Sequence, residues 1–421
     1  MSSFNKVLSC GIDFGTSNSS VAIAHRGKIE LVAVEGQEVT IPTAIFFQPG
    51  LPPLFGRQAT RWFFERHEGR FMRSLKRVLG TPLMKQGTVI NGKAVKFERI
   101  IASFLAHLRA STITSAGEPV ENVVMGRPVH FIDNNSEGDQ RAQDELKVIA
   151  QTVGFRHVEF QFEPIAAAFA HEVKIEAEQL ALVADLGGGT SDFTVIKVSK
   201  KNVSKRDRSS DILGNSGVRV GGNDFDKELV LAAIMPEIGY RSTYGSKNLE
   251  VPLKYYHDLA EWSKVNFLYT PKTLSHAREL FNQSHDPVRF GRLLKILEDE
   301  SGHALLAVAE DAKIALTNSE SISAPMDFLE PRLSIPMTRK VFQDSIANEV
   351  EKIAGSAKDC LRQAGVTADQ IQLVILTGGS TEIPMVRKAF IDLFPTAQIA
   401  DENKLSSVGL GLAYDSERRF R

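Results

Sequence analysis

Residues 185–192 read Asp-Leu-Gly-Gly-Gly-Thr-Ser-Asp, and residues 13–18 read Asp-Phe-Gly-Thr-Ser-Asn. Each segment follows an apolar run and precedes another, which predicts two strand–turn–strand units of the same design. A repeated unit of this kind indicates a duplicated fold in which two turns face each other. The sequence therefore predicts an α/β protein built from two similar halves.

Outward from these turns, strands and helices alternate along the chain. Thr338–Gln363 has the pattern of a long amphipathic helix closed by Gly365, and Ser136 is expected to cap a helix with Asp139 as the acidic partner of a capping box. Strands are expected at residues 7–12, 19–24, 122–125, 180–185, 193–198 and 371–377, and helices at 97–112, 136–153, 338–363 and 406–418. Residues 57–80 and 249–303 fit neither repeat and are interpreted as insertions capping each half.

The composition is that of an ordinary globular chain. A length of 421 residues suggests two or more domains. The net charge of −1 gives no electrostatic footprint for nucleic acid or an anionic membrane. No apolar run approaches the roughly 18 residues that a membrane helix needs, and the N-terminus has no signal-peptide pattern, so a cytoplasmic location is expected.

Two further features receive structural interpretations. Cys10 and Cys360 lie too far apart in the sequence to indicate a disulfide framework or a metal cluster, and both are expected to be buried. A basic cluster is interpreted as a solvated hairpin, because no aromatic residues interleave with it for base stacking. Its members are Lys200, Lys201, Lys205, Arg206 and Arg208.

The two repeated turns have the composition of phosphate-binding loops. A phosphate needs converging backbone N–H groups and a backbone that approaches without Cβ clashes, and glycine and small hydroxyl residues supply both. Asp13 and Asp185 lie at strand ends, where carboxylates can hold Mg²⁺ through its waters. An ordinary hairpin or a flexible loop is the alternative for either turn alone. The candidate phosphate contacts are Gly15, Thr16, Ser17, Asn18, Gly187, Gly188, Gly189 and Thr190.

Two more glycine pairs occur at the ends of predicted elements. Gly221, Gly222 and Asn223 precede a predicted helix, whose N-terminus suits an anion; a simple cap made by Asn223 or Asp224 is the alternative. Residues 376–381 follow a strand and precede a helix, so that Gly378, Gly379 and Ser380 could lie against an adenosine, or form only a structural turn. The chain carries no Gly-x-x-x-x-Gly-Lys-Ser/Thr loop.

Together these motifs resemble those of the seventy-kilodalton heat-shock chaperones, which belong to the actin-like ATPase superfamily. Residues 11–19 and 185–192 resemble the family's phosphate motifs, 376–384 its adenosine motif, and 221–226 a segment typical of the chaperones rather than of actin or sugar kinases. The motifs keep the family's order across nearly the whole chain, and residues 124–129 and 160–168 are most similar to a short bacterial member. The resemblance implies a duplicated ribonuclease-H-like fold with two lobes around a cleft for ATP or ADP with Mg²⁺.

The resemblance also implies roles for single residues. Lys76 would be the catalytic lysine that steadies the γ-phosphate and the attacking water, while a surface lysine is the alternative from sequence alone. Glu163 would orient water and magnesium, Asp185 would polarise the water, and Thr190 would contact the γ-phosphate. Thr16 and Ser17 would hold the β-phosphate, and Asp13 would share the hydrated Mg²⁺ with Asp185 and Glu163.

The adenosine side is implied in the same way. Glu310 and Lys313 would bind the ribose hydroxyls, with an ordinary surface ion pair as the alternative, and Asp401 would join the nucleotide contacts. Ile314 and Glu382 stand where the family has two arginines that sandwich adenine. Since neither provides cation–π stacking, weaker adenine binding and a looser base preference are expected.

The chain ends at Arg421, where the family would continue with a linker, a peptide-binding β-sandwich and a helical lid. Any contact with a protein client is therefore expected to use the lobes themselves or a separate protein, and a co-chaperone would bind through the lobes. Lobe I is predicted to comprise residues 1–175 with a returning segment at 401–421, and lobe II residues 176–400.

The expected activity is slow ATP hydrolysis by water without a covalent intermediate. The alternatives are a non-hydrolysing nucleotide sensor or co-chaperone, a small-metabolite kinase of the same superfamily and, more distantly, a filament-forming actin relative.

Overall fold

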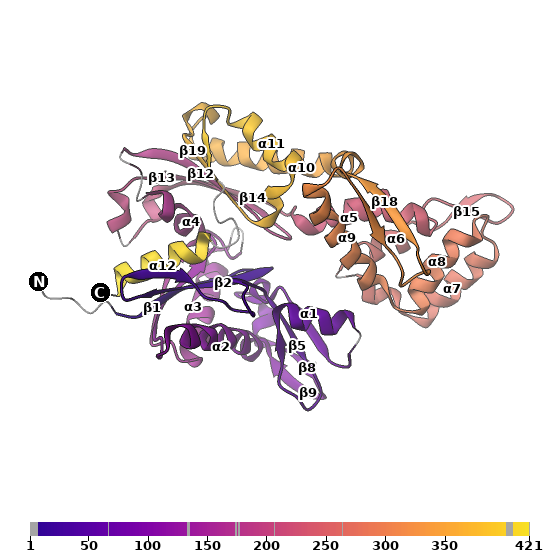
Figure 1. Ribbon diagram of the computed structural model, residues 1–421, viewed down its shortest axis with the longest axis horizontal. Helices are drawn as coiled ribbons and strands as arrows, with labels where there is room; N and C mark the ends of the chain where they lie inside the picture. Colours follow the sequence, from indigo (N-terminus) through magenta and orange to yellow (C-terminus); the bar gives the residue numbers. More distant parts are fainter. Residues whose placement is uncertain are drawn as a thin grey trace, which may run out of the picture.

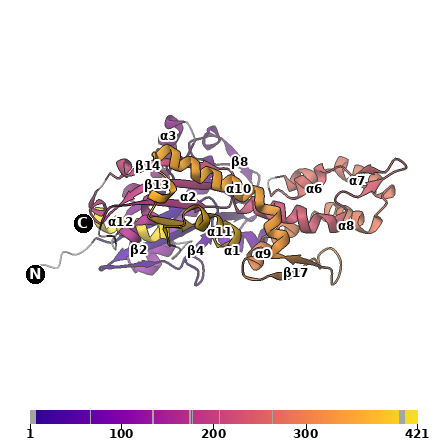
Figure 2. The ribbon, with the colours of Figure 1, turned by 90° about the horizontal axis from the view of Figure 1, so that it is seen from above.

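The computed structural model describes residues 7–65, 67–132, 135–172, 175, 177–205, 207–262, 264–400 and 407–420. Two central sheets lie one above the other in Figure 1, and a helical extension projects from one end of the upper half. Figure 2 shows that helices α6, α7 and α8 extend to one side, beyond both sheets.

The first sheet is built around β1 (Ser9–Phe14). It has the order β11-β10-β1-β2-β3, with β4 pairing to β2. β1, β2 and β3 are antiparallel, whereas β10 and β11 are parallel to β1. The other strands are β2 (Asn18–His25), β3 (Lys28–Leu31), β4 (Thr40–Pro42), β10 (Asn122–Arg127) and β11 (His157–Phe162).

The second sheet repeats this arrangement around β12 (Gln179–Leu186). Its order is β14-β13-β12-β19-β20, again with three antiparallel strands followed by two parallel ones. The other strands are β13 (Ser191–Val198), β14 (Ile212–Val218), β19 (Leu373–Thr377) and β20 (Gln398–Ala400). The shared order and directions confirm the predicted duplication.

Helices cover the outer faces of the sheets and also fill the space between them. α2 (Phe97–Ala116) and α3 (Ser136–Thr152) pack on the first half, and α10 (Arg339–Ala364) and α11 (Pro384–Leu393) pack on the second. α4 (Glu163–Glu172) and α12 (Ser407–Arg419) lie between the two sheets (Figure 1). A buried apolar cluster there, which includes Val124, Ala166, Ala181, Ile375 and Leu412, joins the halves.

Each half carries an insertion that is longer than the sequence indicated. The first contains β5 (Ala44–Phe47), β6 (Leu54–Phe55), α1 (Gly56–Phe64), β7 (Arg70–Arg73), the 3-10 helices η1 (Leu75–Val78) and η2 (Pro82–Lys85), β8 (Gly87–Ile90) and β9 (Lys93–Lys96). The second contains α5 (Gly222–Leu229), β15 (Thr243–Tyr244), β16 (Leu249–Glu250), α6 (Lys254–Leu259), α7 (Pro271–Asn282), α8 (Pro287–Glu298), α9 (Gly302–Asn318), β17 (Ser321–Pro325) and β18 (Ser334–Thr338).

Local chemistry explains where the long helix α10 begins and ends. The Thr338 hydroxyl accepts a hydrogen bond from the backbone N–H of Val341 (3.3 Å), and Gly365 ends the helix in the left-handed conformation (φ 67°). Phe342, Ile346 and several later apolar residues at helical spacing are buried. The predicted extent and C-terminal glycine are confirmed.

The predicted cap of α3 is wrong. Asn135, not Ser136, precedes the helix, and its side-chain oxygen accepts from the backbone N–H of Gly138 (2.9 Å). The carboxylate of Asp139 instead accepts from Arg127 and from the backbone N–H of Phe131, both at 2.5 Å. Asp139 therefore fastens the preceding loop to the helix, which leaves the capping box unformed.

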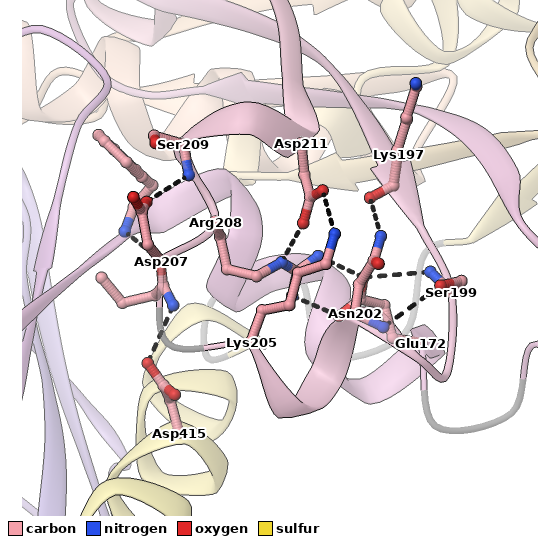
Figure 3. Close-up of polar contacts among 12 residues, drawn as sticks. Glu172, Lys197, Ser199, Asn202, Lys205, Asp207, Arg208, Ser209, Asp211 and Asp415 are labelled. Atoms are coloured by element: carbon pink, nitrogen blue, oxygen red, sulfur yellow. Dashed lines mark hydrogen bonds and ion pairs between the residues drawn. The ribbon is translucent and has the colours of Figure 1, made fainter.

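The interpretation of the basic cluster is also wrong in one respect. The Arg208 side chain is fully buried (0% exposed), and its guanidinium donates to Glu172 at 2.6 and 2.9 Å and to Asp211 (Figure 3). Burial raises the pKa of Glu172, and Arg208 opposes this rise. The segment between β13 and β14 is thus attached by a buried charge network to the end of α4.

Two other expectations concern single residues and helix lengths. Cys10 and Cys360 are both buried, as predicted, and burial raises the pKa of Cys360 to about 11. Among the described residues, every helix is too short or too polar to cross a bilayer.

Candidate functional site

The two repeated turns lie against each other at the ends of the two central strands. β1 runs into the first turn after Asp13, and β12 runs into the second after Asp185. A Cβ added to Gly188 would lie 2.6 Å from the hydroxyl oxygen of Ser17. The first and second turns are therefore in direct contact, and glycine at 188 is what permits the approach.

The third glycine pair packs onto the second turn. The backbone N–H groups of Gly222 and Asn223 donate to the carbonyls of Gly187 (3.0 Å) and Gly188 (2.7 Å). The Asp224 carboxylate accepts from the backbone N–H of Gly221 (2.9 Å), so the cap considered as an alternative is present. Gly222 and Asn223 thus shape the second turn, and these two N–H groups are committed to it.

The fourth glycine segment reaches the same place. Gly378 has a φ of +85°, a conformation that favours glycine, and a short 3-10 helix (Gly379–Glu382) separates it from α11. The Ser380 hydroxyl donates to the carbonyl of Gly187 (3.5 Å). All four predicted glycine segments therefore converge, although nearly 200 residues separate some of them in the sequence.

A cluster of charged side chains lies beside the converging turns. The ammonium of Lys76, on η1, donates to the carboxylate of Glu163 at 2.5 Å, and their side chains are 9% and 14% exposed. Burial, reinforced by the charges of Glu163 and Asp185, raises the pKa of Asp13 to about 8, while Lys76 opposes the rise. Burial and then Glu163 also raise the pKa of Asp185.

The charge balance of this cluster favours a bound cation. Burial opposes the charged form of Lys76, but Glu163 and Asp13 outweigh it and raise its pKa. One ammonium thus faces three carboxylates, an excess of negative charge that a divalent cation would relieve. Within the described ranges no three His, Cys, Asp or Glu side chains are placed to hold a metal directly. Carboxylate oxygens are the ligands that Mg²⁺ prefers, so the donor set of Asp13, Asp185 and Glu163 fits this ion with several of its waters kept.

Two of the residues expected to contact adenosine, Glu310 and Lys313, lie on α9. The ammonium of Lys313 lies 2.9 Å from the carboxylate of Asp226 and 3.3 Å from the carbonyl of Gly222, which places it beside the third turn. Burial raises the pKa of Asp226 to about 6, against the effect of Lys313. Glu310 is exposed on the same helix.

The two positions that depart from the adenine sandwich are both accessible. Ile314 is 56% exposed and Glu382 is also exposed.

Thr190, whose hydroxyl donates to the carboxylate of Asp192 (3.0 Å), lies in the second turn. Asp401 lies outside the described residues.

Asp226 is the site residue to which the sequence assigned no role. It belongs to the quoted segment 221–226, and its position four residues after Gly222 places both on one face of a helix. That spacing is the signal that could have identified it as the partner of a lysine near the third turn.

Comparison with known proteins agrees with this geometry. The model of the family described as "Hsp70 protein" matches residues 9–266 and 295–416. "Chaperone protein DnaK" of Deinococcus proteolyticus is 25% identical over 430 aligned positions, which cover 96% of this chain and 58% of the relative. The protein of the same name from Thermus thermophilus is 26% identical over 431 positions, which cover 96% and 59%.

The chain thus spans somewhat more than half the length of these curated relatives. The matched ranges include both repeated turns, Lys76, Glu163 and the segment around Gly378. With the duplicated actin-like fold and the converging motifs, this match shows that the chain belongs to the Hsp70 family and corresponds to its chaperone-type nucleotide-binding domain.

Proposed function

We propose that this chain binds ATP with Mg²⁺ between its two halves and hydrolyses it slowly with water as the nucleophile. The observation that carries the proposal is the ion pair of Lys76 and Glu163, which lies beside Asp13 and Asp185 where the glycine turns converge. An ammonium among carboxylates at a phosphate site can both stabilise the charge of the transferred phosphoryl group and help to orient water.

Each part of the site has a distinct task in this proposal. The turn at Gly15–Asn18 and the turn at Gly187–Thr190 supply backbone N–H and hydroxyl groups to the phosphates. Asp185 and Glu163 accept hydrogen bonds from the attacking water and orient it. Asp13, with these two carboxylates, holds the waters of Mg²⁺, which when bound would neutralise phosphate charge.

The base is held less firmly than a cation–π sandwich would hold it. Ile314 offers an exposed apolar surface for one face of the ring, and Glu382 offers no cation. Lys313 and Glu310 remain the proposed ribose contacts, with Lys313 fixed by Asp226. ATP affinity in the micromolar range is therefore expected; nanomolar affinity would contradict this account of the base site.

The proposed lobe boundaries rest on the packing of α12, and the proposed protein partners rest on the curated relatives. Lobe I would comprise residues 1–175 with 401–421, which the packing of α12 on β1 and α4 supports, and lobe II would comprise residues 176–400. Because the curated relatives are chaperones, we propose that a protein client or co-chaperone binds to the outer surfaces of these lobes.

The test is single-turnover hydrolysis of ATP with Mg²⁺, comparing the unmodified protein with Lys76→Ala. We expect the variant to bind ATP and to lose hydrolysis by a factor of roughly 100 or more. Lys147→Ala is the matched control, because Lys147 is an exposed lysine on α3. Its rate should match that of the unmodified protein.

Other outcomes would select the other functions. ATP binding with equally negligible turnover in the unmodified protein and in Lys76→Ala would favour the nucleotide-sensing or co-chaperone function. Transfer of the γ-phosphate to a small acceptor, rather than to water, would favour the metabolite kinase.

A further inference from the structure

Thr377 lies beside Asp185 in the second sheet. It is the last residue of β19, which runs parallel to β12, and the register pairs it directly with Asp185. Neighbouring strands of a sheet lie roughly 4.8 Å apart, and residues in register on parallel strands point to the same face. The Thr377 side chain therefore lies next to the carboxylate that is proposed to orient the attacking water.

The alternation of side chains along both strands shows which face this is. Val183 of β12 and Ile375 of β19 belong to the buried cluster between the two halves. Asp185 and Thr377 each follow one of these residues by two positions, so both point to the same side as that cluster. Thr377 therefore faces the space between the halves, where the glycine turns converge.

Thr377 is the neighbour that can donate a hydrogen bond to the Asp185 carboxylate. On the other side of Asp185 the antiparallel register places Asp192, whose carboxylate accepts from the Thr190 hydroxyl (3.0 Å). An ionised carboxylate accepts hydrogen bonds and donates none, whereas a threonine hydroxyl can donate. Of the two residues that flank Asp185 across the sheet, Thr377 is thus the one with a donor on its side chain.

The Thr377 hydroxyl is not committed to another group in the described part of the chain. The residue is 2% exposed, and its hydroxyl oxygen makes no hydrogen bond of normal geometry to any described atom. Burial and then the charge of Glu163 raise the pKa of Asp185, and the nearby Thr377 hydroxyl opposes this rise. Because a buried hydroxyl is stabilised by donating to a charged acceptor, the Asp185 carboxylate is its natural partner.

The first half has a glycine at the equivalent place. β1 and β10 pair in parallel, and their register, continued by one residue, places Gly126 beside Asp13. A Cβ added to Gly126 would lie 3.1 Å from Cγ of Glu163, so the glycine leaves room for that side chain. At this place the first half provides space for Glu163 and the second half provides a hydroxyl. The repeated fold itself therefore does not require Thr377.

We propose that Thr377 is a positioning residue, whose hydroxyl donates to the carboxylate of Asp185 and holds it in the orientation that accepts a hydrogen bond from the attacking water. This inference rests on the proposed function, since it requires water to attack a bound nucleotide beside Asp185. A carboxylate has two oxygens that accept hydrogen bonds, so a donor on one oxygen fixes the group and leaves the other for water. Removing a partner of this kind lowers activity roughly 10- to 100-fold.

The experiment compares single-turnover hydrolysis of ATP with Mg²⁺ by the full chain in the unmodified protein and in Thr377→Val. Valine keeps the branched shape of threonine but lacks the hydroxyl. We expect hydrolysis to be roughly tenfold slower or more, while the Kd for ATP, measured by calorimetric titration, stays within about twofold. Thr377→Ser keeps the hydroxyl and should restore most of the rate. Circular dichroism and the thermal midpoint would establish that each variant is folded, and Thr377→Ala is the second variant without a hydroxyl.

Two further variants separate positioning from a general structural effect. In an Asp185→Asn background, Thr377→Val should cause no further loss, because the carboxylate that the hydroxyl orients is gone, whereas independent residues would give additive losses. Thr112→Val is the matched control, since Thr112 is also a fully buried threonine and its hydroxyl donates within α2 to the Leu108 carbonyl (2.8 Å). Its rate of hydrolysis should match that of the unmodified protein.

Each contrary outcome contradicts a stated part of the inference. Hydrolysis by folded Thr377→Val within twofold of the unmodified rate would overturn the role of Thr377 and leave the proposed function standing. Equal losses in Thr377→Val and Thr377→Ser, or a loss that weaker ATP binding explains, would show that the hydroxyl does not act by orienting Asp185. Absence of hydrolysis in the unmodified protein would overturn the proposed function, and this inference with it.

Discussion

Acidification should open the contact at which Phe63 and Phe64 of the first half pack on His303 and Trp262 of the second, here called the aromatic clasp, through protonation of His303. Burial, together with the nearby charge of Arg73, lowers the pKa of His303 to about 4, against an ordinary value of about 6.5 for a solvated imidazole. A lowered pKa means that the closed clasp favours the neutral ring. The stability of the closed state is therefore complete above pH 6.5 and is lost as the pH falls toward 4.

The expected change in the ratio of open to closed molecules follows from these two pKa values of the His303 ring. At pH 7.5 the ring is almost entirely neutral whether the clasp is open or closed. At pH 5.5 about nine in ten solvated rings would carry a proton, while nearly all clasped rings would not, so the ratio of open to closed molecules should rise roughly tenfold. This corresponds to about 1.4 kcal/mol.

The chain has two tryptophans, so Trp62 is replaced by phenylalanine to leave Trp262 as the fluorophore. The assay is acrylamide quenching of Trp262 in this nucleotide-free Trp62→Phe protein at pH 7.5 and 5.5. We expect quenching to increase at the lower pH as the indole becomes accessible. Other cleft groups titrate in the same range, Asp226 among them, so His303→Phe is the control that keeps a ring against Phe63. An equal pH response in His303→Phe, or the absence of any response in the parent, would refute the reasoning.

Three further predictions concern the buried network and the turns. Arg208→Met should lower the free energy of unfolding by about 3–5 kcal/mol, because it leaves the buried Glu172 without a cation and Asp211 with Lys205 alone. Urea denaturation would measure the change, and a loss below 1 kcal/mol would contradict the network. Gly188→Ala should weaken ATP binding at least tenfold, because the added carbon would displace Ser17. Gly189→Ala should leave ATP binding unchanged, because no atom lies within 4 Å of its added carbon. Calorimetric titration would compare the two variants, and equal losses of affinity would contradict this prediction. The pKa of Asp13 is raised to about 8, so the Asp13 carboxyl destabilises the fold increasingly as the pH rises from 4 to 8. Asp13→Asn should therefore raise the thermal midpoint, measured in EDTA, more at pH 7.5 than at pH 5. An equal rise at both pH values would contradict this prediction.

The architecture could be predicted from the sequence because its signals are local. The two repeated turns lie between strands whose apolar composition is evident over six to eight residues, and the register of Asp13 with Ser20 and of Asp185 with Asp192 follows from the turn length. The duplication then predicts that the two turns face each other, which their contact confirms.

The features that were missed depend on partners distant in sequence. Nothing local distinguishes Arg208 from the lysines around it, and its burial depends on Glu172, 36 residues away. The clasp pairs Phe64 with Trp262 across a gap of nearly 200 residues, and neither residue belongs to a motif. The prediction of the α3 cap was wrong for a different reason. Asn135 and Ser136 are both good caps, and the carboxylate of Asp139 pairs with Arg127 instead of forming a capping box.

The position of α12 has a consequence for synthesis on the ribosome. The hydroxyls of Ser9 and Ser416 lie 2.9 Å apart, and the α12 backbone packs so closely on β1 that a Cβ at Gly11 would overlap Leu412 and Ala413. One face of β1 is therefore covered by residues translated some 400 positions later. At 5–20 residues per second, the first sheet waits roughly 20–80 s for its last helix. During that interval Val124 and its apolar neighbours lack part of their final packing, so the first half is exposed to aggregation until α12 has been synthesised.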